Sequence, residues 1–271
     1  MKRKAVLRAL FCAVFLCGGL SSRLVQASET LGGEAAWHLH RPESAWLQAY
    51  DPTLLSPRLL TQWEREDRSN GDSTGKVYVN LREAFLISPN LAFGVQAELP
   101  LNWVTKGGED FSGAGDMEVR AGFVGRANAK VRWGLGMNAR FDTASEPALG
   151  DSLFELRPIG ALRWDATRNL NLGLNAEWTF SPDPKEGKEV ENLQLKLPIT
   201  FKLNSRLSGF VSYQPKWDLT EGGNRRDLVD VSTTVLLGKG KHVALTAGME
   251  FPLSADVLDW KPFVGVQWFF R

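Results

Sequence analysis

The sequence predicts an all-β protein, a transmembrane antiparallel up-and-down β-barrel of about 12 strands. Three observations predict this fold. Apolar and polar residues alternate over long segments, an apolar export signal opens the chain, and large aromatic residues collect near the ends of the alternating segments. No stretch after residue 27 approaches the roughly 18 consecutive apolar residues of a membrane-spanning helix, so strands would carry the chain across a bilayer.

Residues 1–27 have the pattern of a secretory signal peptide. The basic start MKRKAVLR precedes a short apolar run, and VQA ends at Ala27 with residues suited to cleavage. Both cysteines, Cys12 and Cys17, lie in this run, so the mature chain would have no disulfide, cysteine nucleophile or thiolate metal site. Cleavage would leave 27 Lys and Arg against 31 Asp and Glu, a net charge of −4, which does not indicate nucleic-acid binding.

The alternation is clearest in VRWGLGMNARFD, residues 131–142, where every second residue is apolar. This run is longer than a typical strand of a soluble protein and matches the roughly 9–11 residues that a tilted strand needs to cross a bilayer. Similar segments recur along the chain and predict strands near 57–67, 75–87, 91–105, 115–125, 131–143, 152–164, 170–181, 191–203, 207–219, 227–238, 242–252 and 260–270.

The connections between these segments alternate in length. Short ones are expected at 88–90, 126–130, 165–169, 204–206 and 238–241. Long ones are expected at 68–74, 106–115, 143–151, 181–189, 221–226 and 252–259. Tight periplasmic turns and longer external loops have this pattern, and an even strand number would place both ends of the barrel in the periplasm.

Alternating strands also build soluble sandwiches and barrels, in which the apolar face points inward. The long strands, the charged opposite face, the terminal aromatics and the export signal favour a membrane barrel. The closing stretch FVGVQWFFR also resembles the assembly signal of bacterial outer-membrane proteins, which here comprises Gly265, Trp268 and Phe270. We therefore expect outer-membrane lipid and the barrel assembly machinery as partners, and an outer-membrane location after cleavage near Ala27.

Alternation assigns a set of mostly polar and charged side chains to the inner face. Both signs of charge are present, so cross-strand acid–base pairs are expected. Such pairs could fill a narrow barrel or line a wet pore whose field selects solutes. The predicted lumen residues are Arg82, Gln96, Glu98, Glu118, Arg120, Arg132, Asn138, Arg140, Glu155, Arg157, Arg163, Asn175, Glu177, Gln194, Lys196, Gln214, Lys216 and Glu250.

The middle of the chain resembles a known family. The stretch GAGDMEVRAGFVGRANAKVRWGLGMNARFDT, residues 113–143, is similar to the family named MetA-pathway of phenol degradation in its Gly-x-Gly-Asp entry into a strand, its short turn and its Gly-rich strand. Residues 153–180 continue the same order. The resemblance implies a porin-like outer-membrane transporter that passes small solutes, including apolar or aromatic ones.

Catalysis and metal binding are not expected. His38 and His40 precede the barrel and His242 follows a turn, so no histidine lies on a strand at the level where outer-membrane hydrolases act. The Gly113-x-Gly115-Asp116 stretch lacks the Lys-Ser/Thr and the helix of a phosphate-binding loop, and its glycines are interpreted as loop residues. The sequence predicts no enzyme, no cofactor and no metal.

The sequence divides into the signal peptide, residues 28–56 and a barrel over residues 57–271. Residues 28–56 mix Trp37, Trp46 and Tyr50 with prolines, and could be a periplasmic extension or a plug in the lumen. The predicted function is passive uptake of small solutes through a channel. The alternative is a closed structural or surface-binding barrel without transport.

Overall fold

The computed structural model describes residues 57–68, 71–184, 189–220, 224–238, 242–253 and 258–270. Within these ranges no helix is long and apolar enough to cross a membrane. Residues 1–56, including the predicted signal peptide and the predicted extension or plug, lie outside the described residues, and their roles stay predictions.

The described residues form thirteen β segments and one short 3₁₀ helix, η3. Their bounds are β1 Arg58–Arg68, β2 Ser73–Ser88, β3 Leu91–Lys106, β4 Glu109–Ala114, β5 Glu118–Arg126, β6 Val131–Arg140, η3 Pro147–Leu149, β7 Glu155–Thr167, β8 Leu170–Phe180, β9 Glu191–Lys202, β10 Leu207–Asp218, β11 Arg225–Leu237, β12 Val243–Pro252 and β13 Leu258–Phe269.

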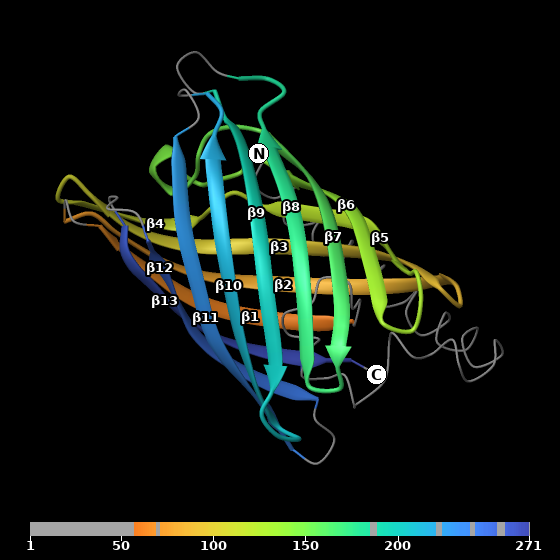
Figure 1. The fold of residues 1–271 in the computed structure, drawn as a ribbon. Helices are drawn as coiled ribbons and strands as arrows, with labels where there is room; N and C mark the ends of the chain where they lie inside the picture. Colours follow the sequence, from red (N-terminus) through yellow and green to blue (C-terminus); the bar gives the residue numbers. More distant parts are fainter. Residues whose placement is uncertain are drawn as a thin grey trace.

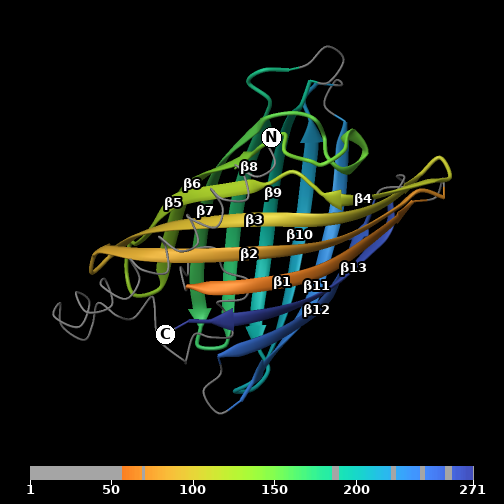
Figure 2. The ribbon, with the colours of Figure 1, turned by 180° about the vertical axis from the view of Figure 1, so that it is seen from behind.

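These segments build a closed antiparallel barrel of 12 strands, which confirms the predicted fold. Neighbouring strands pair in chain order, with β4 and β5 both paired to β3 and together forming the fourth barrel strand. β1 pairs with both β2 and β13, so the sheet has no free edge along this seam. Closure satisfies the backbone hydrogen bonds that lipid cannot satisfy. Figures 1 and 2 show the strong tilt of the strands, since β1–β3 on one wall cross β7–β10 on the other at a wide angle.

The fourth barrel strand, made of β4 and β5, differs from the prediction at its start. Residues 106–115 were expected to form a long loop, but Gly107 and Gly108, with φ of 60° and 84°, make a two-residue turn. The chain then returns at once as β4, which pairs with the end of β3 from Leu101↔Ala114 to Lys106↔Glu109. The strand is interrupted after Ala114 and resumes at Glu118 as β5, which continues the pairing with β3.

The two faces of the barrel are inverted relative to a soluble protein. The outer face carries the exposed large apolar side chains, such as Leu135 (62%) and Val264 (50%). The inner face carries buried polar ones, such as Asn138 (1%), Arg163 (2%) and Thr234 (0%). An apolar exterior around a polar interior is the pattern of a barrel that stands in lipid.

Tryptophans mark both ends of the outer face. Trp63, Trp103, Trp178 and Trp260 lie toward the end with the longer connections, here called the loop end. Trp164 and Trp268 lie toward the opposite end, the turn end. All six are between 39% and 49% exposed, as expected for indole rings at membrane–water interfaces.

The last strand closes the barrel. Its pairing with β1 runs from Arg58↔Phe269 through Gln62↔Gly265, and the Phe270 N–H donates to the Pro57 carbonyl at 3.0 Å. In the predicted assembly signal, Gly265 faces inward, while Trp268 and Phe270 are 39% and 46% exposed on the lipid side. Both strand ends at this seam lie at the turn end of the barrel.

Candidate functional site

Every predicted lumen residue lies on the inner face of the barrel. Each alternates along its strand with an outward apolar residue, and the strand pairing places inner residues opposite inner residues, as in Glu118↔Arg140 and Asn175↔Lys196. The face is therefore largely polar, and successive rows of register partners differ in charge and polarity.

One row across six neighbouring strands is rich in arginine and contains no carboxylate. Its members are consecutive register partners, and we call it the basic row: Arg58, Arg82, Gln96, Arg120, Asn138 and Arg157. Arg82 donates two hydrogen bonds to the Gln96 side chain, at 3.0 and 2.7 Å, and Arg58 donates one to Gln267 at 2.8 Å. Arg58 and Arg82 thus donate to neutral amides, whereas Arg157 contacts carboxylates of the adjacent row.

Toward the turn end, the basic row gives way to two rows of small and apolar residues. We call these rows the apolar belt; they are Ala84, Gly94, Gly122, Gly136 and Ile159, followed by Leu86, Ala92, Val124, Gly134 and Ala161. Beyond the belt, the next row is basic again, with Arg126, Arg132 and Arg163 in register. An apolar strip thus lies between two bands of positive charge.

Toward the loop end, a network of ions connects β5, β6 and β7. Arg157 contacts both Glu118 (3.2 Å) and Glu155 (3.0 Å), and Arg140 contacts the same two carboxylates at 3.2 and 3.4 Å. Asn138 donates a further hydrogen bond to Glu118 at 2.8 Å. Glu155 is 4% exposed, so this network, called the ion cluster below, compensates charges that are largely withdrawn from water.

Further acid–base pairs bridge the inner face elsewhere. Arg132 binds Asp165 through two hydrogen bonds, at 2.6 and 3.1 Å. Lys196 contacts Glu177 at 3.0 Å, and Lys261 contacts Glu250 at 3.2 Å. The wall therefore has the paired charges that the sequence predicted on cross-strand grounds.

The connection between β6 and β7, residues 141–154, is folded back against the inner face. Asp116, 5% exposed, accepts hydrogen bonds from the backbone N–H groups of Thr143 (3.1 Å), Ala144 (3.0 Å) and Asp151 (2.8 Å). The inward side chain of Asn102 donates to the Leu149 carbonyl at 2.7 Å. The loop is thereby fixed at both of its ends and at its middle.

The packing of this loop explains the glycines around Asp116. A Cβ atom on Gly150 would lie 2.5 Å from Oδ2 of Asp116, and one on Gly115 would overlap the Asn102 amide. Arg140 adds an ion pair to Asp151. The Gly-x-Gly-Asp stretch is therefore an anchor for loop 141–154, a role that the sequence interpretation of loop glycines did not foresee.

The anchored loop forms one wall of a cavity at the loop end. This cavity holds about 1160 Å³ of empty space, part of it open to solvent. Pro147 and Leu149 of the loop face inner residues of β1, β2 and β3 such as Lys76 and Glu98 across it. Four basic side chains and six carboxylates line the cavity, so the loop narrows an entrance that is strongly polar.

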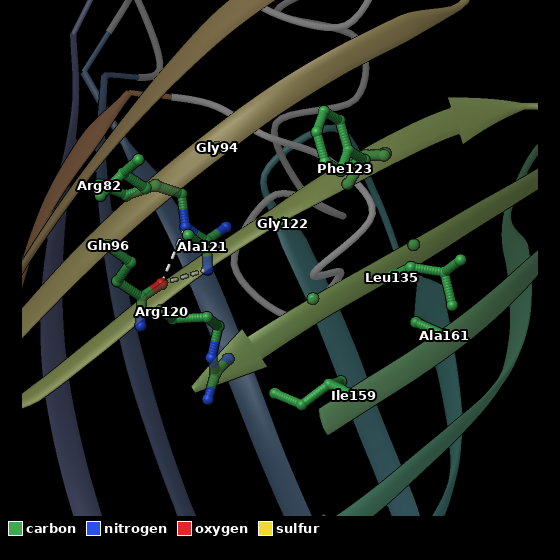
Figure 3. Close-up of a pocket in the computed structure, with 14 residues that line it drawn as sticks. Arg82, Gly94, Gln96, Arg120, Ala121, Gly122, Phe123, Leu135, Ile159 and Ala161 are labelled. Atoms are coloured by element: carbon green, nitrogen blue, oxygen red, sulfur yellow. Dashed lines mark hydrogen bonds between the residues drawn. The ribbon is translucent and has the colours of Figure 1, made fainter. Parts of the chain in front are cut away.

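A second, smaller cavity lies in the wall itself. It has about 520 Å³ of empty space, part of it open to solvent. Belt residues of β3, β5, β6 and β7 line it together with Arg82, Gln96 and Arg120 of the basic row, and the outward residues Val95, Ala121, Phe123 and Leu135 complete its lining. Figure 3 shows these three polar side chains on one side of the pocket, with Ile159, Leu135 and Ala161 on the other.

His242 is the one histidine among the described residues, and it lines neither cavity. His242 lies in the turn between β11 and β12, where its carbonyl accepts a hydrogen bond from the Phe269 N–H. His38 and His40 lie outside the described residues. Within the described part of the chain, no group of three or more His, Cys, Asp or Glu could hold a metal ion.

The fold is shared with solved outer-membrane channels. The chain is similar to the COG4313 outer membrane channel from Pseudomonas putida F1, with a TM-score of 0.66 and 12% identity over 79% of this chain and 95% of that one. It is also similar to the NanC porin (TM-score 0.57, 11% identity, 78% and 100% covered) and to the KdgM porin (0.55, 16%, 79% and 99%).

At these identities the likeness shows the fold alone. No family model matches the sequence, and no curated protein matches it. The shared architecture is the 12-strand outer-membrane barrel, and what this particular barrel passes or binds depends on its own lining.

Proposed function

We propose that this protein is a channel in the outer membrane of a Gram-negative bacterium, through which small solutes diffuse passively. The observation that carries this proposal is the largely polar inner face, which contains a basic row and a charged entrance at the loop end. Paired charges could also fill a narrow barrel, and the cavity open to solvent at the loop end is what favours a wet lumen. The shared fold with channels and porins is consistent with this proposal.

The wall suggests how solutes are sorted. The narrowed entrance admits small molecules, and the paired charges below it favour solutes with polar groups. An apolar or aromatic solute, the kind that the family resemblance implies, would meet an apolar surface in the belt near the turn end. In this proposal transport follows the concentration gradient and needs neither a cofactor nor catalysis.

One observation favours the alternative of a barrel without transport. Loop 141–154 is anchored firmly across the entrance by Asp116 and Asn102. A barrel whose mouth was fully closed in this way would act through its outer surface.

Single-channel recording in planar bilayers separates the two. The mature chain, residues 28–271, would be refolded beside a chain that starts at residue 57, and folding would be checked by heat-modifiable mobility on gels. We expect discrete conductance steps from the mature chain. Steps from the shortened chain alone would assign residues 28–56 as a plug, and silence from both folded chains would favour the closed barrel.

A further inference from the structure

The cavity in the apolar belt has features that the passage of solutes does not require. A water-filled channel needs a polar wall, yet this part of the wall offers bare apolar surface next to an arginine. Four strands contribute to it in exact register, from Gly94 through Gly122 and Gly136 to Ile159.

The floor of the pocket is peptide backbone because no side chain fits there. A Cβ atom on Gly122 would lie 2.6 Å from the Leu135 carbonyl oxygen, and one on Gly136 would lie 2.9 Å from that of Ala121. The neighbouring backbone therefore excludes a side chain at both positions, and only glycine is accommodated there. A shallow flat surface results, bordered by Val124, Ile159 and Ala161.

Arg120 stands at the border of this surface and differs from its neighbours in the basic row. Its Nε is buried without a hydrogen-bond partner among the described residues. Glu98, Glu118 and Glu177 lie within electrostatic range of its charge without a hydrogen bond to it. The Glu118 oxygens are instead taken by Arg140, Arg157 and Asn138. A buried, unpartnered donor is costly, and an anion would relieve that cost.

We propose that this pocket binds small organic monocarboxylates with an apolar body, held by Arg120. The carboxylate would accept two parallel hydrogen bonds from the guanidinium, the geometry that such pairs favour. The apolar body would lie on the glycine floor of β5 and β6 against Ile159 and Ala161.

Both halves of the ligand are needed for this fit. Acetate offers the charge without the apolar body, and benzyl alcohol offers the apolar body without the charge. Benzoate and hexanoate offer both. The inference thus deepens the proposed function by naming a solute class, and it rests on that function only for the step from binding to passage.

Calorimetric titration of the detergent-solubilised mature chain tests the site without any bilayer. We expect saturable binding of benzoate and hexanoate, with acetate and benzyl alcohol weaker by about tenfold or more. Arg120→Gln removes the charge and Ala161→Phe fills the pocket, and each should weaken benzoate binding by about tenfold or more. Lys202→Gln is the matched control. It removes one positive charge at the turn end of β9, and Lys202 does not line the pocket.

The outcomes separate the site from the channel. Equal affinity of the native chain, R120Q and A161F for benzoate would overturn the site, as would no binding to a chain shown to be folded. Acetate bound as tightly as benzoate would overturn the apolar half. Benzoate binding with no conductance would leave the site standing and reject the channel, whereas conductance without binding would do the reverse.

Discussion

Asp116 accepts the backbone N–H of Asp151, 35 residues further along the chain, at 2.8 Å. The same carboxylate accepts the N–H groups of Thr143 and Ala144, so one side chain fixes both ends of the loop. Because Asp116 stands where the fourth strand is interrupted, the break between β4 and β5 is what turns this carboxylate toward the loop.

The first prediction concerns this anchor. Asp116→Ala removes three hydrogen bonds to a carboxylate, each worth roughly 1.5–3 kcal/mol. Loop 141–154 should leave the entrance, so single-channel conductance should rise and chymotrypsin should cut the loop faster. Asp110→Ala is the control, because Asp110 accepts only an exposed bond from Thr105 within the β3–β4 hairpin. Unchanged conductance and cleavage in D116A would show that the loop is held by other contacts.

The second prediction concerns steric contact between Gly150 of loop 141–154 and Asp116. A methyl group at Gly150 would meet Asp116 at 2.5 Å, whereas one at Gly75 would have nothing nearer than 3.9 Å. Gly150→Ala should therefore raise conductance and loop cleavage in the same direction as Asp116→Ala, while Gly75→Ala should behave like the native chain. If G150A matched G75A in both measurements, the packing around Asp116 would be looser than the structure shows.

The strand bounds could be predicted closely because the alternation of apolar and polar residues identifies each strand without knowledge of its neighbours. The segment expected at 91–105 forms β3 at Leu91–Lys106, and that expected at 170–181 forms β8 at Leu170–Phe180. Inward and outward faces also follow from alternation once lipid is taken as the outer medium.

Alternation could not predict the features that depend on how two strands pair. The segment EDFSGA has one large apolar residue, and it becomes β4 only because the Gly107–Gly108 turn returns it to β3. The apolar belt likewise needs the stagger between strands, which places Gly94 opposite Gly122. Asp116 was missed because its partners are distant in sequence.

The third prediction concerns assembly. Trp268 and Phe270 project from the last strand toward lipid, so Trp268→Ala with Phe270→Ala should lower the amount of folded, heat-modifiable protein in the outer membrane several-fold. Val264→Ala on the same strand and face serves as the control, since Val264 is also outward and 50% exposed. Equal loss in both variants would mean that apolar surface in general, and not the terminal aromatic pattern, determines assembly.

The fourth prediction concerns the ion cluster. Glu155 meets Arg140 and Arg157 where it is 4% exposed, so Glu155→Gln leaves two guanidinium groups in a poorly hydrated wall with one carboxylate fewer. Loss of one partner from a buried pair costs about 3–5 kcal/mol, and a wet lumen places the expected loss near the lower end. Urea unfolding of the refolded chain, followed by tryptophan fluorescence, measures this free energy.

The matched variant removes a carboxylate from a pair at the rim. Asp67 contacts Arg65 at 3.0 Å, but their side chains are 33% and 54% exposed, and such pairs contribute at most about 1 kcal/mol. Asp67→Asn should thus unfold at nearly the native urea concentration, and Glu155→Gln at a clearly lower one. If the two variants lost the same small amount, the lumen around β5–β7 would be hydrated enough to screen its charges, and solutes crossing it would meet a weaker field than the cluster implies.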